Sequence, residues 1–206
     1  MTKLVQLFSF DVVGSASYKT LRQGVGDTPE WIGAFLNFFE ELPLLFTAEI
    51  ARAFFDEPGE IPIVPVWKAI GDEVVFMAFP NSRRELQLLT QACVATMAKA
   101  NEHFRKQWEL QIHGVTWSLE LGNRNRSIRF RELESNSEAV MDLIGPDVDL
   151  GFRLTSHAPI GGVLVTQNHA EELTDCGLEV KQIGQSYLKG ISLEAYPLLL
   201  VKEQEG

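Results

Sequence analysis

The stretch VPVWKAIGDEVVFMAF, Val64 to Phe79, decides how we interpret the rest of this chain. Two apolar runs flank the pair Gly71-Asp72, a pattern that predicts two β-strands joined by a tight turn. The turn carries a carboxylate, and Lys68 places a cation on the otherwise apolar first strand. Because a purely structural hairpin needs neither charge, this hairpin is a candidate site as well as a part of the core.

A second carboxylate, Asp11, ends the segment LVQLFSFDVV, whose alternating apolar residues indicate a central strand. The small residues Gly14 to Ser17 follow at once. Divalent cations prefer carboxylate oxygens, and backbone N–H groups at such turns bind phosphate. Two strand-end aspartates beside a small-residue turn therefore predict a site for a divalent metal and a phosphate.

The composition is that of a soluble globular protein, with 45% hydrophobic and 22% charged residues among 206. We expect one domain over residues 1–206. No apolar run approaches a membrane span, and MTKLVQLFSFD has no signal-peptide pattern, so we expect no membrane partner. Two cysteines without a CxxC motif fit a reducing cytosol, which predicts a cytoplasmic protein. A net charge of −10 argues against nucleic acid as a partner.

Two helices are predicted on either side of the hairpin. Thr28 as N-cap and Pro29 as first residue start the one before it, and Pro43 is expected to break or kink it. Its apolar stripe is wide, which suggests burial on two sides, against the sheet and against a partner. Ser82 and Glu85 form a capping box for the helix after it, whose apolar stripe runs to Trp108.

The remaining chain predicts strands at 110–122 and 127–133, a helix at 145–157, a buried strand at 161–167, a helical turn at 168–173 and a last strand from Tyr196. This order predicts an α+β fold with a ferredoxin-like βαββαβ core, extra strands and an enlarged first helical region. We expect the helices to pack on one face of a sheet that contains antiparallel strands.

Four motifs, in the same order, resemble those of class III nucleotidyl cyclase catalytic domains. FSFDVVGS resembles F-x-D-I-x-G-F, and KAIGDEVVF resembles K-x-x-G-D. DLIGPDVDLGFRLTSHAPIGGVLVT resembles D-x-x-G-x-x-V-N-x-A-x-R-L with a following Pro-Gly turn, and LKGISLEAYPL resembles L-K-G-x…Y. A single Gly-Asp pair would mean nothing, but the four together run from about Leu4 to Val201. The resemblance implies the fold of that family.

The resemblance also implies roles for individual residues. Asp11 and Asp72, assisted by the Val12 carbonyl, would hold two Mg²⁺ or Mn²⁺ ions. The backbone of Val13, Gly14 and Ser15 would cradle the triphosphate of the substrate. In the family, a site of this kind is shared between two subunits, so the resemblance implies a head-to-tail homodimer.

Further implied roles fall on later residues. Arg153 would stabilise the transition state, and Lys189 could reach the distal phosphates. Lys68 and Asp142 occupy the positions that read the base. Asp149 departs from the family, since purine cyclases usually have Asn there, and it could pair with Arg153 one helical turn away or face the ribose or base.

Each of these residues also has a plain structural interpretation. A strand-end Asp before Gly is often only a turn former, and residues four apart such as Asp149 and Arg153 often form a surface ion pair. Lys68 could extend from a sheet edge, and Asp142 could cap a helix. The four histidines have no ligand spacing and are interpreted as structural or solvent-exposed: His103, His113, His157 and His169.

The implied activity is metal-dependent conversion of a nucleoside triphosphate to a 3′,5′-cyclic nucleotide and pyrophosphate. WKAIGDE, GPDVDLGFR and the aromatic insert WIGAFLNFFEELPLLF look closest to bacterial pyrimidine cyclases of Pycsar anti-phage systems. That likeness implies UTP ahead of CTP and a separate effector protein activated by the product. We expect bulk from the insert to favour a single-ring base. Two alternatives remain open, an adenylate cyclase and an inactive cyclase-like domain that binds nucleotide or a partner.

Overall fold

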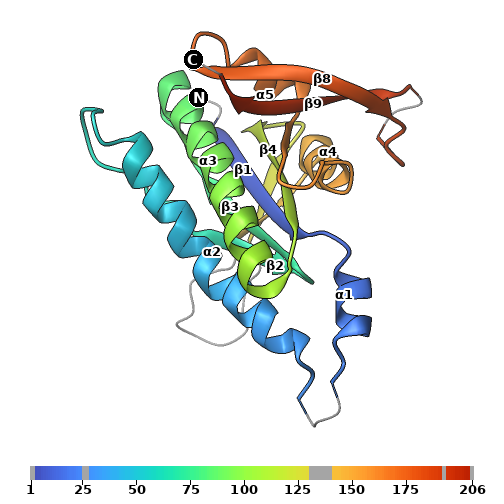
Figure 1. The fold of residues 1–206 in the computed structure, drawn as a ribbon. Coiled ribbons are helices and arrows are strands. Elements are labelled where there is room, and N and C mark those ends of the chain that lie inside the picture. Colours follow the sequence, from blue (N-terminus) through green and yellow to red (C-terminus); the bar gives the residue numbers. More distant parts are fainter. Residues whose placement is uncertain (1–2, 25–27, 130–140, 192–193, 205–206) are drawn as a thin grey trace.

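The computed structural model describes residues 3–24, 28–129, 141–191 and 194–204 (Figure 1). Its centre is β1 (Lys3–Val12), which pairs antiparallel with β3 (Glu73–Ala78) on one side and with β4 (Ile112–Leu121) on the other. β2 (Val66–Ile70) pairs with β3 and completes the predicted hairpin. The order β2-β3-β1-β4 is that of a ferredoxin-like core, with α2 (Trp31–Ala53) and α3 (Arg83–Trp108) as its two helical connections.

Three more strands extend this core into a seven-stranded sheet with the order β2-β3-β1-β4-β7-β9-β8. β7 (Val163–Val165) runs parallel to β4, whereas β9 (Tyr196–Glu203) and β8 (Leu178–Ser186) are antiparallel to their neighbours. β5 (Arg126–Arg129) and β6 (Met141–Ile144) form a separate two-stranded sheet. The remaining helices are α1 (Ser15–Leu21), α4 (Pro146–Thr155) and α5 (Gln167–Glu171). The predicted α+β fold with extra strands is confirmed.

The helices cover both faces of the sheet, so the expectation of one covered face was wrong. Phe8 and Phe10 of β1 point into a core cluster with α2 and α3, whereas Val5 and Leu7 point into a second cluster with α4. Strand residues alternate between faces, so both faces of β1 are apolar and both need a cover. On the second face Gly151 of α4 lies so close to the Trp117 ring that a Cβ would be 2.1 Å from it.

The first long helix, α2, differs from its prediction both at its N-cap and at Pro43. Glu30 is the N-cap and the helix begins at Trp31, and it continues through Pro43 to Ala53. A proline inside a helix costs about 3 kcal/mol. Buried residues on both sides of Pro43, such as Phe38 and Phe46, pack against the sheet and α3, and their burial outweighs that cost.

The side chains of α2 that point away from the sheet include Leu36 and Leu44, both more than half exposed. The sheet and α3 together bury the wide apolar stripe of α2, and a further partner over Leu36 and Leu44 stays a prediction. The next helix begins as predicted, since the Ser82 hydroxyl accepts the Glu85 N–H at 3.1 Å.

Several elements were not predicted, namely α1, β6 and β8. The predicted strand at 127–133 lies partly outside the described residues, and only β5 is described there. The helix at 145–157 and the strand at 161–167 are found with shorter bounds, as α4 and β7. Within the described residues, no helix combines the length and the apolar character needed to span a bilayer.

Candidate active site

Three acidic residues converge where β1 ends beside the β2–β3 turn. Asp11 lies directly opposite Glu73 in the antiparallel register of β1 and β3, and Asp72 precedes Glu73 in the turn. Gly71 has φ 68°, a conformation that favours glycine and lets the turn close in two residues. Strand alternation places Asp11 and Glu73 on the face that α4 covers. The two aspartates singled out by the sequence therefore share one end of the sheet.

Glu73 is held by neighbouring hydroxyls. The Ser9 hydroxyl donates to it, and the Thr155 hydroxyl of α4 lies 3.5 Å from the same oxygen. Burial raises the pKa of Glu73 above its ordinary value, and the nearby charges of Asp11 and Asp72 raise it further, against the opposing effect of these hydrogen bonds. The acids thus repel one another, which is the electrostatic condition that a bound cation relieves.

His113 of β4 bridges Asp11 to the chain after α4. Its Nε2 lies 3.3 Å from Asp11 Oδ2, and its Nδ1 lies 2.8 Å from the Ala158 carbonyl oxygen. Burial lowers the pKa of His113, but the bonds to Asp11 and Ala158 outweigh burial and leave it raised. With an acceptor at each nitrogen, the doubly protonated ring is the form that satisfies both. His113 is buried, which agrees with its interpretation as a structural residue, but sequence reasoning did not anticipate its contact with Asp11.

Lys19 of α1 is a second residue that sequence reasoning missed. Its Nζ lies 3.9 Å from Asp72 Oδ1. The same ammonium lies 4.6 Å from the centre of the Phe35 ring and 5.4 Å from that of Trp31. Figure 1 shows α1 following the end of β1, away from the sheet. The unpredicted helix α1 therefore brings a cation to the acidic cluster.

The backbone N–H groups after Asp11 differ in how they are used. The Val13 N–H donates to the Gln111 carbonyl at 2.8 Å, so it is already used. Gly14 has φ 65° and stands as the N-cap of α1. The amides of the first helical turn have no partner within their helix. The N–H groups that remain for an anion thus begin after Val13.

The two residues expected to read the base are in contact. Lys68 Nζ of β2 lies 2.8 Å from Asp142 Oδ1 of β6, and it also lies 3.8 Å from the centre of the Trp67 ring. The Trp67 indole N–H donates to the Met141 carbonyl at 2.9 Å. Asp142 therefore belongs to a strand and an ion pair, not to a helix cap, and Lys68 does not simply extend into solvent.

The aromatic insert does not surround this pair. Phe35, Phe38 and Phe46 of α2 lie in the core cluster on the α2–α3 face. Trp67 and Phe152 belong to the cluster on the opposite face, with ring centres 6.4 Å apart. The expectation that the insert crowds the base was therefore wrong, and the aromatic bulk beside Lys68 comes from Trp67 and Phe152 instead.

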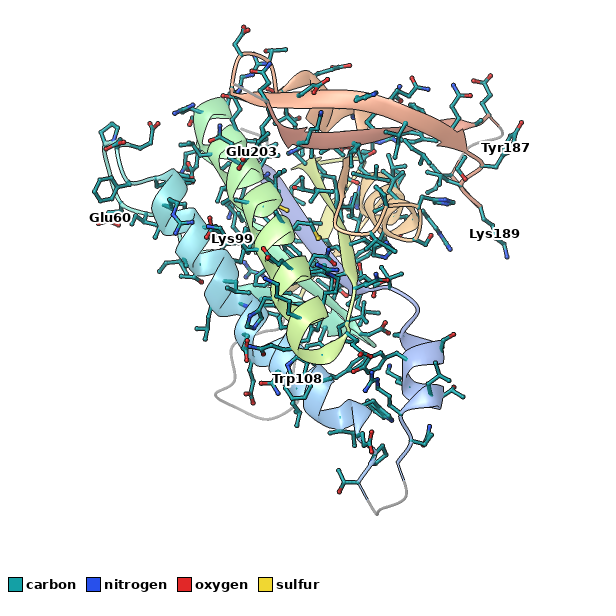
Figure 2. The ribbon with its side chains drawn as sticks, viewed as in Figure 1. Glu60, Lys99, Trp108, Tyr187, Lys189 and Glu203 are labelled. Carbon is teal, nitrogen blue, oxygen red and sulfur yellow. The ribbon has the colours of Figure 1, made fainter. Side chains whose placement is uncertain are left out.

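The predicted site residues on α4 and after β8 are exposed. Asp149 and Arg153 are both exposed, and no ion pair within 4.0 Å joins them in the described chain. Lys189 is exposed in the connection after β8, and Figure 2 shows it near Tyr187 at the end of the β8–β9 hairpin. No ion pair of the described residues joins Arg153 or Lys189 to Asp11 or Asp72.

The carboxylates of Asp11 and Asp72 suit a hard divalent cation whose other ligands are water and substrate. No group of three or more His, Cys, Asp or Glu side chains in the described residues is arranged as a complete metal site. Mg²⁺ usually takes one or two carboxylates and fills the rest of its shell with water and substrate phosphate. Asp11 and Asp72 supply two carboxylates in a setting of mutual repulsion, so they fit Mg²⁺ or Mn²⁺ in that role.

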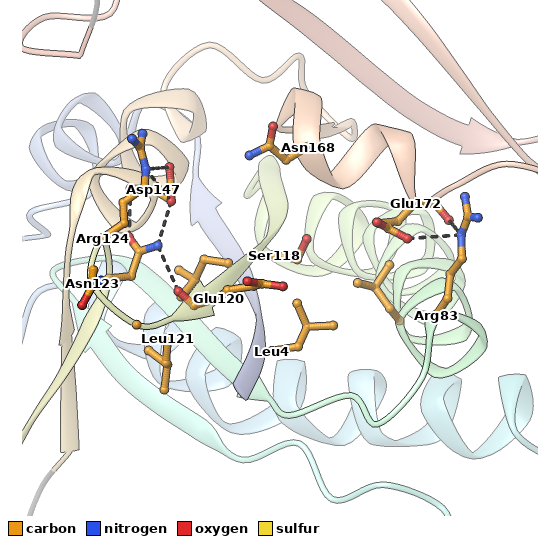
Figure 3. Close-up of a pocket in the computed structure, with 14 residues that line it drawn as sticks. Leu4, Arg83, Ser118, Glu120, Leu121, Asn123, Arg124, Asp147, Asn168 and Glu172 are labelled. Atoms are coloured by element: carbon orange, nitrogen blue, oxygen red, sulfur yellow. Dashed lines mark hydrogen bonds and ion pairs between the residues drawn. The ribbon is translucent and has the colours of Figure 1, made fainter. Parts of the chain in front are cut away.

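A sizeable cavity lies elsewhere, at the amino end of β1. It has a volume of about 610 Å³ and is lined by Leu4, Ser118 and Glu120, among others (Figure 3). Leu4 precedes Asp11 by seven residues, roughly 23 Å along a strand. Arg83 and Arg124 at its rim are paired with Glu172 and Asp147. None of the predicted site residues lines it, so we place the candidate site at the acidic cluster.

No protein-family model matches the sequence, and no curated protein matches it. Solved structures do match. The adenylyl cyclase CyaB from P. aeruginosa is 16% identical, with a TM-score of 0.65 over 100% of this chain and 96% of that one. The guanylate cyclase domain of RhGC from Catenaria anguillulae in complex with GTP is 15% identical, with a TM-score of 0.66 over 98% of each chain.

A third match is the catalytic core of a rhodopsin-guanylyl cyclase with converted specificity, in complex with ATPαS. It is 14% identical, with a TM-score of 0.68 over 98% of this chain and 97% of that one. At this level of identity the likeness establishes the fold. The chain has the fold of class III nucleotidyl cyclase catalytic domains.

Proposed function

We propose that residues 1–206 form one catalytic domain that converts a nucleoside triphosphate to a 3′,5′-cyclic nucleotide and pyrophosphate. The observation that carries the proposal is the convergence of Asp11, Asp72 and Glu73 at one end of β1. It occurs in a fold shared with adenylyl and guanylyl cyclase domains. Fold alone does not imply activity, so the proposal rests on this acidic cluster within it.

Asp11 and Asp72, with the Val12 carbonyl, would hold two Mg²⁺ or Mn²⁺ ions. Such ions lower the pKa of an attacking hydroxyl, here the ribose 3′-OH, and neutralise a leaving polyphosphate. The chain itself orients their carboxylate ligand, because His113 binds one Asp11 oxygen and is anchored to the Ala158 carbonyl. Glu73 adds negative charge behind the two aspartates and is fixed by Ser9.

The phosphates would meet the backbone after Asp11. Val13 has spent its N–H on Gln111, so Gly14 and Ser15 are the predicted residues left to donate to a triphosphate. Arg153 would stabilise the charge that develops at the transferred phosphoryl group, and Lys189 would bind the distal phosphates. Both are exposed. That exposure supports delivery to the site of a second copy in a head-to-tail homodimer.

For the base we propose a pyrimidine, with UTP ahead of CTP. Lys68 and Asp142 already satisfy each other, so a base must compete with their ion pair. Trp67 and Phe152 stand beside that pair, and the indole is fixed by its bond to Met141. Rigid aromatic bulk disfavours a fused ring, since overpacking costs about 1–3 kcal/mol, which corresponds to roughly ten- to a hundredfold in selection. If the ion pair opens to read a purine edge, ATP is the alternative.

The likeness of WKAIGDE and GPDVDLGFR to Pycsar cyclases supports a biological role in antiviral defence. In that role the cyclic nucleotide would be a second messenger, and a separate effector protein would respond to it. Asp149 supports the competing possibility of a binding-only domain, because its exposed carboxylate stands where an asparagine is usual in purine cyclases.

Competition among the four nucleotides tests the substrate. ATP, GTP, CTP and UTP at equal concentration are incubated with the protein and Mn²⁺, and the products are identified by mass. We expect cyclic UMP as the main product and cyclic CMP second. Mainly cyclic AMP or cyclic GMP would contradict the proposed base, and no cyclic product at all would favour the binding-only domain.

A further inference from the structure

The Lys19 ammonium lies among three side chains, those of Asp72, Phe35 and Trp31. It lies 3.9 Å from Asp72 Oδ1 and over the Phe35 and Trp31 rings at 4.6 and 5.4 Å. The Lys19 and Asp72 side chains are 30% and 23% exposed, so water screens the pair only in part. An ammonium held over aromatic faces gains further attraction from the rings. The cation is thus positioned before any ligand arrives.

The position of α1 places the Lys19 ammonium near the proposed triphosphate site. The helix begins at Ser15, directly after the turn at Gly14, and Lys19 follows Ser15 by four residues. Residues four apart lie on the same side of a helix. Lys19 therefore lies on the side of α1 that carries Ser15, one helical turn from the backbone proposed to meet a triphosphate.

The charge balance shows what Lys19 can do there. Among the ion pairs of the described residues, Lys19 is the lysine or arginine that lies within 4.0 Å of one of the two aspartates, namely Asp72. Asp11 is contacted by His113. A divalent ion on Asp72 would repel an ammonium at that distance, and a triphosphate would attract it. The flexible four-carbon stem of lysine allows the ammonium to move between such neighbours while its root stays on the helix.

We propose that Lys19 is a substrate-binding residue that neutralises Asp72 in the free protein and contacts the polyphosphate of the bound nucleotide. This inference rests on the proposed function of the acidic cluster as a metal–triphosphate site. It also assigns a role to the aromatic residues at the start of α2. Trp31 and Phe35 hold the ammonium near both Asp72, its neighbour in the free protein, and the polyphosphate of the bound nucleotide. The ligand class is a metal-bound polyphosphate, whatever base it carries.

The test uses probes that need no turnover and no knowledge of the base. Binding of tripolyphosphate with Mn²⁺, and of Mn²⁺ alone, is measured by calorimetry and by electron paramagnetic resonance. The variants are Lys19→Met, which keeps the length, Lys19→Gln as a second neutral form and Lys19→Arg, which keeps the charge. Lys106→Met is the matched control, because Lys106 lies on α3 in an exposed pair with Glu102.

Loss of one charge-assisted contact should weaken tripolyphosphate binding about tenfold in Lys19→Met and Lys19→Gln. Lys19→Arg and Lys106→Met should bind it as the natural chain does. Mn²⁺ alone should bind the neutral variants as tightly as the natural chain or more tightly, because no ammonium competes for Asp72. Unchanged tripolyphosphate affinity in both neutral variants, or an equal loss of affinity for Mn²⁺ alone, would overturn the role of Lys19.

Failure of the proposed function has a different signature. If the natural chain binds neither tripolyphosphate nor a nucleoside triphosphate in the presence of Mn²⁺, the metal–triphosphate site is refuted, and the role of Lys19 with it. If the natural chain binds these ligands and the neutral variants bind them equally well, the site stands and only the inference on Lys19 fails.

Discussion

The two ends of β1 differ in what they offer a ligand. The amino end opens into a cavity of about 610 Å³, but its arginines Arg83 and Arg124 are each paired with a carboxylate. The carboxyl end gathers Asp11, Asp72 and Glu73, where burial raises the pKa of Glu73 and the charges of the two aspartates raise it further. Lys19 and His113 offset part of this negative charge, but acids held side by side still repel one another, and a bound cation relieves that repulsion. The cavity at the amino end holds no comparable electrostatic repulsion, so it is weaker evidence for a binding site than the acidic cluster.

The largest effect is expected from the aspartates. Asp11→Ala and Asp72→Ala should each abolish turnover while leaving thermal unfolding close to that of the natural chain, because one carboxylate cannot hold two metal ions. Glu120→Ala, at the amino-end cavity, is the control and should leave turnover unchanged. Full activity in either aspartate variant would remove the difference between the two ends.

The next effect concerns assembly. Asp72→Ala and Arg153→Ala should each be inactive alone and should rescue each other when mixed, because each mixed dimer holds one intact site. Random exchange makes half the dimers mixed, so about a quarter of the natural activity should return. An active monomer, or no rescue despite proven subunit exchange, would mean that the carboxyl end is complete within one chain.

A smaller effect should follow the loss of His113. Replacing it with Phe removes the bond that orients Asp11, and supporting groups of this kind typically change metal affinity about ten- to a hundredfold. We expect weaker Mn²⁺ binding, measured in the absence of nucleotide, and His113→Gln should keep part of the affinity through its amide. Unaltered Mn²⁺ affinity in His113→Phe would show that Asp11 needs no support.

The smallest effect is one of stability. The pKa of Glu73 is raised by burial and by its acidic neighbours, so the folded chain keeps that proton to higher pH than the unfolded chain. Its contribution is fully present below the ordinary glutamate pKa and is lost as pH rises through the raised one.

Glu73→Gln should therefore melt a few degrees higher than the natural chain at neutral pH and no higher at acidic pH. The comparison of melting temperatures across pH checks this prediction. An equal shift at every pH would point to packing and not to charge.

The sequence predicted the parts of the fold that local chemistry controls. The hairpin around Gly71, the capping by Ser82 and the central strand ending at Asp11 are found where their patterns place them. Pro43 misled because tertiary burial of α2 outweighs a local helix-breaking signal. β8 was missed because most of its residues are exposed at a sheet edge, which leaves no apolar alternation to detect.

In the candidate site too, the residues that local sequence patterns mark were predicted, and those that tertiary contacts bring in were not. Asp11 and Asp72 are visible because each follows an apolar strand at a turn. His113 meets Asp11 only through the pairing of β1 with β4, about a hundred residues apart in the chain, and no local pattern predicts that register. Lys19 reaches Asp72 through α1, whose polar sequence carries no apolar stripe and shows no buried residue.

The most direct test of the central claim follows both products of a single reaction. The natural chain and Asp72→Ala are incubated with UTP and Mn²⁺, and phosphorus NMR and mass spectrometry follow the nucleotide and the released phosphate. The account predicts that the natural chain forms cyclic UMP and pyrophosphate in equal amounts, and that Asp72→Ala forms neither. Formation of linear UMP or inorganic phosphate without a cyclic product, or equal turnover by both proteins, would contradict it.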